Sequence, residues 1–480
     1  LSFIMSVNAF KNKSFIYLVS KFFAAVFHLL SIYIFTRIFN PEVYGDFLLF
    51  SSYVMFVCSF IFWWHRLSVY RYYHKFKKNL NTYIKTSYFS FYALSIFLIL
   101  IYLLLTAASF LEILNVKNIF LLSILASIVK SNFDLTQNLL NINRNDTFYG
   151  VNVIIRPLLF LSVCLLIHSF FPNNHYTLLI GFMVSFFFSS IPSSYYFQKK
   201  MGGGYFDKQI IKKFISYGFP LTGLFFFDYI LTSSDRILIG YFFDSKMVGI
   251  YGANYDFIKQ IVLFLMIIQG LIIYPEINRS YEEKDNDEVE NLMSLNLNLF
   301  LVVIFPLSIF IALFNEFISS VFIGADFNYP SSLLITSFSI MFFFWGLKIY
   351  HFDYVFFLKE KTKLSMNILF FGSLVNICLN LVFIPKYELM GAALSTVFAY
   401  SICLFISFYK GRELMKIKCD KAILLKALSF VSITVIISLI MRFMGFHIIY
   451  QMTIFLLFYS LLTMLFNFTT IKQFLNRFVH

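Results

Sequence analysis

The sequence predicts an all-α protein that crosses a membrane many times, with about 14 transmembrane helices. Of its 480 residues, 60% are hydrophobic and 13% are charged, and the mean hydropathy is +0.78. Apolar segments of about 20 residues, long enough to span a bilayer as a helix, recur from end to end. These runs are continuous rather than alternating, which argues against a β-barrel. A soluble protein of this length could not bury so much apolar surface.

The spans follow from these apolar runs in order. The segments at 118–140 and 214–233 are the most polar of them. The spans are expected at residues 14–36, 46–64, 84–105, 118–140, 148–168, 176–197, 214–233, 248–273, 293–314, 331–357, 364–384, 390–409, 423–441 and 448–468.

The spans fall into two bundles of six and a last pair. The predicted domains are an amino-terminal bundle (1–197), a basic cytoplasmic linker (198–213), a carboxyl-terminal bundle (214–409) and spans 13 and 14 with a tail (410–480). The glycine cluster "MGGGYF" in the linker is expected to be a flexible joint.

The charge distribution sets the expected orientation. With the amino terminus inside, 25 of the 38 Lys and Arg residues fall in inside segments and 6 fall in outside loops. Positive charge is enriched in cytoplasmic loops, so both termini are expected in the cytoplasm of a cell that carries the protein in its plasma (inner) membrane. The net charge of +14 is therefore attributed to topology and not to nucleic-acid binding. No cleaved signal peptide is expected, and Met5 is a candidate start.

The sequence carries no motif for catalysis or for a cofactor. It contains no P-loop, no nucleophile-elbow motif and no zinc-protease motif. Its five Cys residues show no spacing typical of a metal site or of a disulfide framework. We therefore predict neither an enzyme, a metal nor a cofactor.

A polar stripe runs along the fourth span. One helical face carries Ser127, Lys130, Asp134, Gln137, Asn138 and Asn141. Lys130 and Asp134 are spaced to pair on the helix. A charge at the bilayer centre costs about 2.5–3.5 kcal/mol on insertion scales, so such groups normally face a cavity or a partner. The stripe is interpreted as the lining of a cavity; the alternative is a neutral pair that joins two helices.

Cationic side chains recur in other spans. The first span carries Lys21 and His28 on one face, and the fifth carries Arg156 beside Pro157. The candidate contacts for an anionic headgroup are Lys21, Lys130, Arg156, Lys259 and Lys348. The candidate polar lining adds Asn376 and Asn380 to Ser127, Gln137, Asn138 and Asn141. Candidates for pairing or ion coupling are His28, Asp134 and Asp256. Cations in several spans predict a positive interior suited to a phosphate or diphosphate group.

Three motifs resemble a known family. They are "TRIFNPEVYGDFLLFSSYV" (36–54), "SDRILIGYFFDSKMVGIYGANYDF" (234–257) and "IPKYELMGAALSTVFAY" (384–400). In their order and spacing they resemble the polysaccharide and O-antigen flippases of the multidrug/oligosaccharidyl-lipid/polysaccharide exporter superfamily. The resemblance covers almost the whole chain.

The first two motifs also resemble each other. Each has an Arg and then a Tyr-Gly pair that opens a helix: Arg37 with Tyr44 and Gly45, and Arg236 with Tyr251 and Gly252. This pattern predicts a parallel internal repeat of spans 1–6 and 7–12, which could rock about a central site. Asp235 and Arg236 are interpreted either as an outer gate or as a pin for an outside loop.

The resemblance implies a flippase that moves an undecaprenyl-diphosphate-linked oligosaccharide from the cytoplasmic to the outer leaflet. Its partners would be this lipid-linked substrate and membrane lipids, together with a polysaccharide polymerase and a chain-length regulator. Three alternatives stay open: a multidrug/cation antiporter, a lipid-linked peptidoglycan precursor flippase and a membrane polysaccharide polymerase.

Overall fold

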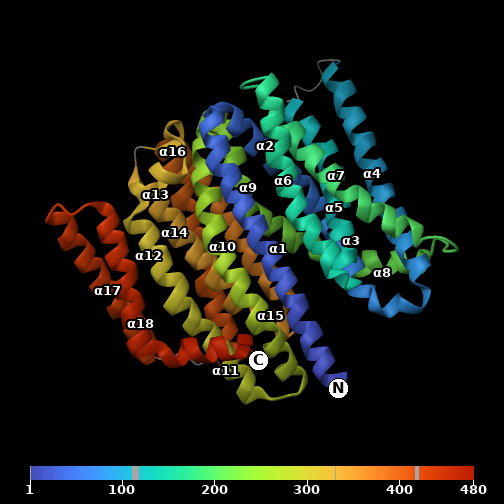
Figure 1. Cartoon of the computed structure of the whole chain (residues 1–480). Helices are drawn as coiled ribbons and strands as arrows, with labels where there is room; N and C mark the ends of the chain where they lie inside the picture. The colour runs from blue at the N-terminus through green and yellow to red at the C-terminus, as the bar shows by residue number, and fades with distance from the viewer. Residues whose placement is uncertain (1, 111–117, 330, 417–420, 480) are drawn as a thin grey trace. The chain divides into compact units, whose positions relative to one another are not determined.

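The described part of the chain is helical, as predicted. The structure is a computed structural model that describes residues 2–110, 118–329, 331–416 and 421–479 (Figure 1). No strand occurs in these residues. Twelve of their helices are long and apolar enough to cross a membrane.

The count of 12 agrees with the predicted 14 spans once one long helix is counted as two and one shorter apolar helix is added. Helix α16 (Thr362–Leu414) contains a break at Glu388, whose φ is 51°. Its two arms fold back on each other, because Asn376 donates a hydrogen bond to Thr396 over 3.2 Å. The shorter apolar helix Ile448–Met464 supplies the last span.

The chain divides into two compact units, Leu1–Gly252 and Ala253–His480. The boundary lies inside helix α10 (Ser245–Glu282). The predicted bundle boundaries at 197, 213 and 409 remain predictions.

The first unit is built around helix α5 (Asn118–Ile142). This helix contacts α2, α3, α4, α6 and α7, so side chains on both of its faces are buried, Phe133 and Leu139 among them. The other elements of the unit are α1 (Ser2–Ile38), α2 (Pro41–Ile61), α3 (Trp63–Tyr72), η1 (His74–Asn79), α4 (Leu80–Phe110), α6 (Asp146–Phe170), α7 (Thr177–Lys199), α8 (Lys208–Gly218), η2 (Phe219–Leu221), α9 (Thr222–Phe242) and the start of α10.

The glycine-rich loop of the linker is docked against α4, and its expected flexibility remains a prediction. The side chain of Asn81 donates to the carbonyl of Gly202 over 2.9 Å, and Lys85 donates to that of Gly204 over 2.7 Å. A Cβ atom on Gly204 would lie 2.6 Å from the backbone carbon of Asn81. Helix α8 then buries Ile210 and Phe214 against this unit.

Helices α2 and α10 begin in the same way. The side chain of Asn40 accepts a hydrogen bond from the backbone N–H of Val43, and that of Asp244 accepts one from Met247. Each acceptor satisfies a backbone N–H of the first helical turn. A glycine follows five residues after each acceptor.

These two glycines, Gly45 and Gly249, lie at a close crossing of α2 and α10. A Cβ atom on Gly45 would lie 1.7 Å from the carbonyl oxygen of Ser245, and one on Gly249 would lie 2.1 Å from that of Pro41. The two contacts are reciprocal, since each glycine meets the residue four positions before the other. This reciprocity pairs Gly45 with Gly249, whereas the sequence comparison paired it with Gly252. Gly252 instead meets the side chain of Leu48.

The second unit contains two wide, π-helical turns. They are η3 (Phe300–Ile304) and η5 (Lys348–Phe352). The remaining elements are α11 (Asn286–Leu299), α12 (Phe305–Leu313), α13 (Asn315–Phe322), η4 (Ala325–Phe327), α14 (Ser332–Leu347), α15 (Asp353–Leu358), α16, α17 (Lys421–Phe443) and α18 (Ile448–Val479). Helices α17 and α18 contact each other and form the red pair in Figure 1.

Candidate functional site

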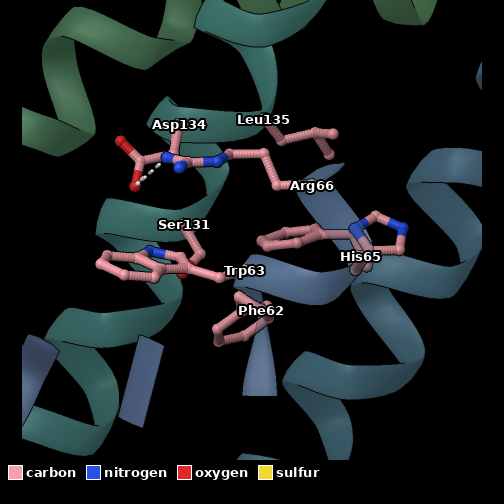
Figure 2. Close-up of a pocket in the computed structure, with 8 residues that line it drawn as sticks. Phe62, Trp63, His65, Arg66, Ser131, Asp134 and Leu135 are labelled. Carbon is pink, nitrogen blue, oxygen red and sulfur yellow. Dashed lines mark ion pairs between the residues drawn. The ribbon is translucent and has the colours of Figure 1, made fainter. Parts of the chain in front are cut away.

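A charged cluster lies on the polar stripe of α5. Lys130 Nζ lies 2.6 Å from Asp134 Oδ2, so the pair predicted from their spacing is present. Arg66 on α3 also reaches this carboxylate, with its Nη1 atom 3.4 Å from the same oxygen. Figure 2 shows the Arg66 side chain extending from α3 to Asp134.

A third cation lies beside this pair. The guanidinium carbon of Arg156 on α6 is 4.8 Å from the ring centre of Phe186 on α7, and Lys130 Nζ is 6.0 Å from the same centre. An aromatic face attracts cations and carries no charge of its own. Arg66 and Lys130 therefore pair with one carboxylate, and Arg156 lies against the same ring as Lys130. We call Arg66, Lys130 and Arg156 the cation cluster; together with Asp134 it carries a formal net charge of plus two.

A narrow pocket opens beside the cation cluster. It is lined by Phe62, Trp63, His65, Arg66, Phe91, Ser131, Asp134 and Leu135 (Figure 2), and its free volume is about 10 Å³. This is room for about one water molecule. In this conformation the pocket therefore suits a small group and would have to widen for a sugar headgroup.

His65 adds no charge to the pocket at neutral pH. Its Nε2 atom lies 2.7 Å from the hydroxyl of Ser90, and its ring is buried. Burial disfavours the charged imidazolium and lowers the pKa of His65 from 6.5 to about 4. The positive charge at the pocket therefore comes from Arg66 and its two neighbours.

Amides on both faces of α5 join it to its neighbours. Asn138 on the stripe donates to the carbonyl of Arg66 over 3.0 Å, and Asn132 on the opposite face donates to Ser190 and Ser194 on α7, each over 3.1 Å. The Asn138 contact therefore fixes the backbone of α3 where Arg66 begins. Both interpretations of the stripe thus have support, because Asn138 joins two helices and Asp134 lines a pocket.

Three predicted lining residues lie off the pocket. The hydroxyl of Ser127 is fully buried and donates to the carbonyl of Ile124 on its own helix. Asn141 is half-buried near the end of α5. Gln137 is 8% exposed, and neither polar atom of its side chain has a partner among the described residues.

Sequence reasoning missed Arg66. The positive-inside count placed it in the inside segment 65–80 as a topological charge. The structure shows that α3 starts at Trp63, directly after α2, and points Arg66 at α5. The signal that could have found it is the pair Trp63-Trp64, because Trp gathers at the membrane interface and puts Arg66 within one turn of it.

Helix α1 places its predicted residues away from the pocket lining. Lys21 is half-buried and His28 is exposed, although Ala25 between them is buried. Arg37 lies at the end of α1, where its guanidinium carbon is 3.7 Å from the ring centre of Tyr33.

The motif residues of the first unit meet at a buried contact. Asp235 and Arg236 lie inside α9, which runs to Phe242, and both are buried. The predicted span, which ended at residue 233, is therefore too short, and the interpretation of the two residues as an outer gate or as a pin for an outside loop remains a prediction. Asp235 is 2% exposed, and Tyr251 donates a hydrogen bond to its carboxylate over 2.8 Å. Tyr44, the other motif tyrosine, is buried on α2.

The second unit holds the remaining predicted residues. Lys348 is fully buried in an ion pair with Asp353. Asn376 and Asn380 are fully buried between the two arms of α16, and Asn380 donates to Asn376 over 3.1 Å. Asp256 and Lys259 are half-buried on α10, where Lys259 Nζ lies 5.7 Å from the ring centre of Tyr255. The roles predicted for these residues remain predictions.

Two family models match the chain. Residues 10–281 match the family described as polysaccharide biosynthesis protein, and residues 150–466 match the lipid II flippase MurJ family. A membrane protein of Methanocaldococcus jannaschii is 22% identical over 256 residues. That match covers 52% of this chain and 49% of the other, so the chain spans about half the length of this curated relative.

Solved structures share the fold. A structure of the lipid II flippase MurJ in an inward closed conformation has a TM-score of 0.70 at 15% identity, covering 94% of this chain and 99% of that chain. An inward-facing MATE family multidrug resistance transporter has a TM-score of 0.64 at 10% identity, covering 81% and 94%. A MATE transporter of Vibrio cholerae has a TM-score of 0.54 at 12% identity, covering 85% and 98%.

These matches confirm the resemblance given by the three motifs. The chain therefore belongs to the multidrug/oligosaccharidyl-lipid/polysaccharide exporter superfamily, within its polysaccharide biosynthesis and lipid II flippase families, and is a multi-pass membrane protein.

Proposed function

We propose that this protein moves an undecaprenyl-diphosphate-linked oligosaccharide from the cytoplasmic to the outer leaflet of the plasma membrane. The oligosaccharide is the repeat unit of an O-antigen or of a related surface polysaccharide. Sugar hydroxyls and a diphosphate are too costly to move through hydrocarbon without a polar path. The lipid tail stays in the bilayer while the headgroup crosses inside the protein.

The cation cluster carries this proposal. Arg66 and Lys130 pair with one carboxylate, Arg156 lies beside Lys130 at the ring of Phe186, and the excess positive charge of the three favours an anion of about two charges. A diphosphate diester has that charge. Arginine also binds phosphate oxygens in a bidentate manner.

The other candidate cations are assigned supporting roles. Lys21, Lys259 and Lys348 are proposed to contact the headgroup at other stages of transport. Asp256 and His28 are proposed to pair with cations or to couple transport to an ion gradient. The two bundles are proposed to rock about a central site, so that it opens to each side in turn.

A lipid-linked peptidoglycan precursor is the second candidate substrate. The match of residues 150–466 to the MurJ family favours it. This precursor also carries a sugar on a diphosphate, so the cation cluster suits both substrates. The two candidate substrates differ in their sugars, which the cation cluster does not distinguish.

The proposal is tested in cells that lack this chain, by measuring the amount and the leaflet of lipid-linked oligosaccharide. We expect completed repeat units to accumulate on the cytoplasmic leaflet and surface polysaccharide to be lost, with wild-type protein restoring both. If lipid-linked peptidoglycan precursor accumulates instead, the second candidate is correct. If single units accumulate unpolymerised on the outer leaflet, the protein is a polymerase and the proposal is wrong. The measurement of surface polysaccharide requires a working polymerase and chain-length regulator, which are the proposed partners.

A further inference from the structure

The second unit contains an ion pair that is closed off from solvent. The side chain of Lys348 is 0% exposed and that of Asp353 is 4% exposed. Ion pairs buried in this way are often no more stabilising than apolar residues of the same volume. Charged groups within membrane-spanning segments are also costly and usually serve a function. Stability alone therefore does not account for the pair.

The wide turn η5 is what brings the two charges together. The backbone N–H of Asp353 bonds to the carbonyl of Lys348, five residues earlier. In a regular α-helix, side chains five positions apart point about 140° away from each other. The π-helical turn closes this angle, so the helix departs from regular geometry at the point where it makes the pair.

A backbone carbonyl of the same turn accepts two side-chain hydrogen bonds. Tyr350 O accepts hydrogen bonds from the side chains of Asn296 on α11 and Tyr274 on α10, each over 2.8 Å. Gln269 on α10 then donates to Asn296 Oδ1 over 2.6 Å. A polar network therefore runs from α10 and α11 to the turn that carries Lys348.

The groups around Asp353 can stabilise both of its protonation states. Besides Lys348, Asp353 accepts hydrogen bonds from Ser365 over 3.1 Å and from Ser407 over 2.7 Å, one on each arm of α16. An ammonium can only donate, but a hydroxyl can donate or accept. If the carboxylate takes up a proton, either serine can rotate to accept a hydrogen bond from the new O–H group.

A second titratable group lies on the same turn. His351 is fully buried, its Nδ1 atom lies 3.3 Å from Asn296 Nδ2, and its Nε2 atom has no partner among the described residues. Since an amide nitrogen only donates, Nδ1 accepts and the proton sits on Nε2. The imidazole is thus neutral, and its Nε2–H group has no hydrogen-bond acceptor among the described residues.

The other titratable groups on the elements packed against the turn are tyrosines or charged groups toward helix ends, including Glu276 and Arg279 on α10. Tyr274 stacks on Tyr350 and Tyr354. Helix α14 carries no Asp, Glu, Lys, Arg or His. The charged groups of α16 and α11 lie toward helix ends and are exposed or half-exposed: Lys363, Lys386, Glu388, Lys410, Arg412, Glu413, Asp287, Glu288 and Glu290.

From this geometry we infer that Asp353 is a proton-binding site whose protonation releases Lys348. A hydronium ion transfers its proton to a carboxylate oxygen of Asp353 and becomes water, and the new O–H group donates a hydrogen bond to Ser365 or Ser407. Asp353 becomes neutral, and the Lys348 ammonium keeps its charge and loses its counter-ion. Because Lys348 is closed off from solvent, the turn must then open before an anion can reach it. The link between this step and transport rests on the proposed function, whereas proton binding itself does not.

Proton binding is tested on the purified full-length protein by infrared difference spectroscopy during acidification. A protonated carboxyl group gives a carbonyl stretching band that a carboxylate lacks. Many carboxylates of the chain contribute to this band, so we expect one component of the wild-type band to be lost in Asp353→Asn and kept in Glu413→Gln, which alters the exposed Lys410–Glu413 pair. If Asp353→Asn does not fold, Ser407→Ala replaces it and is expected to shift the frequency of the band. A band that is unchanged in both variants would overturn the inference.

The link to transport is tested with the apolar double variant Lys348→Met/Asp353→Leu in vesicles that carry an imposed pH gradient. A merely structural pair predicts a double variant that transports with the same pH dependence as the wild type, which would overturn the coupling. We expect instead a folded variant whose transport no longer responds to the gradient. The infrared band requires no substrate, so it reports on Asp353 even if the proposed substrate is wrong.

Discussion

Arg66 and Asp134 lie 3.4 Å apart and join α3 to α5 beside a small pocket. The carboxylate of Asp134 is held at the same time by Lys130, 2.6 Å away. Under the proposed function, Asp134 occupies the position relative to these two cations that an anionic headgroup would take. The protein would then supply its own anion, and we expect substrate binding to displace it.

Replacement of Arg66 tests the role of the cation that sequence reasoning missed. We expect Arg66→Ala to weaken binding of inorganic diphosphate by about tenfold or more, because a hydrogen bond to a charged group contributes about 1.5–3 kcal/mol. Binding is measured by calorimetry on the purified protein. Arg71→Ala is the matched control, because Arg71 lies on the same helix and its guanidinium faces the ring of Tyr217. Equal affinities for the two variants would remove Arg66 from the site.

Replacement of Asp134 tests the displacement itself. Asp134→Asn removes the built-in anion while keeping the shape of the side chain. We expect tighter binding of inorganic diphosphate together with slower transport, because release then loses its competitor. Calorimetry gives the affinity, and a vesicle assay gives the rate. Weaker binding in Asp134→Asn would show that the carboxylate orients the cations rather than competing with the ligand.

The crossing of α2 and α10 predicts a strict demand for glycine. Alanine at position 45 or 249 would place a Cβ atom against a backbone carbonyl, which no side-chain rotation can relieve. We expect Gly45→Ala and Gly249→Ala each to lower the free energy of unfolding by about 1–3 kcal/mol or more. Thermal unfolding in detergent measures this effect.

Gly202→Ala is the control for the crossing, because a Cβ atom there would meet only the carbonyl of Lys199 at 3.7 Å. If Gly45→Ala is as stable as this control, the reciprocal packing that pairs Gly45 with Gly249 is wrong.

His65 predicts a loss of stability in mild acid. Burial lowers the pKa of the folded-state imidazole from 6.5 to about 4, so the unfolded chain binds this proton first as the pH falls. Stability from His65 is therefore complete above pH 6.5 and decreases toward pH 4 by at most about 1.4 kcal/mol per pH unit. The melting temperature of His65→Gln should fall less than that of the wild type over this range. Parallel curves for the two proteins would contradict the assignment.

Much of the fold could be predicted from the sequence because the bilayer restricts the choices. Apolar runs of helical length predict spans, and the spacing of Lys130 and Asp134 predicts their pair. The hairpin of α16 was also predicted as two spans, since Pro385 and the polar residues near Glu388 interrupt the apolar run.

The site was less predictable, because pairwise spacing rules assume a regular α-helix. Lys348 and Asp353 are five positions apart and meet only on a π-helical turn. Arg66 meets Asp134 from another helix, a contact that no local spacing encodes. The repeat pairs Gly45 with Gly252 by residue type, whereas close backbone approach brings Gly45 to Gly249, a contact that the sequence pattern does not encode.

We propose that the cation cluster binds the anionic headgroup during translocation. The rate at which purified protein in vesicles moves a lipid-diphosphate-linked oligosaccharide between leaflets measures this role. We predict that Arg66→Ala/Lys130→Ala abolishes this movement, whereas Arg71→Ala/Lys410→Ala, which removes two cations outside the cluster, keeps the wild-type rate. Equal rates for the two double variants would contradict the account.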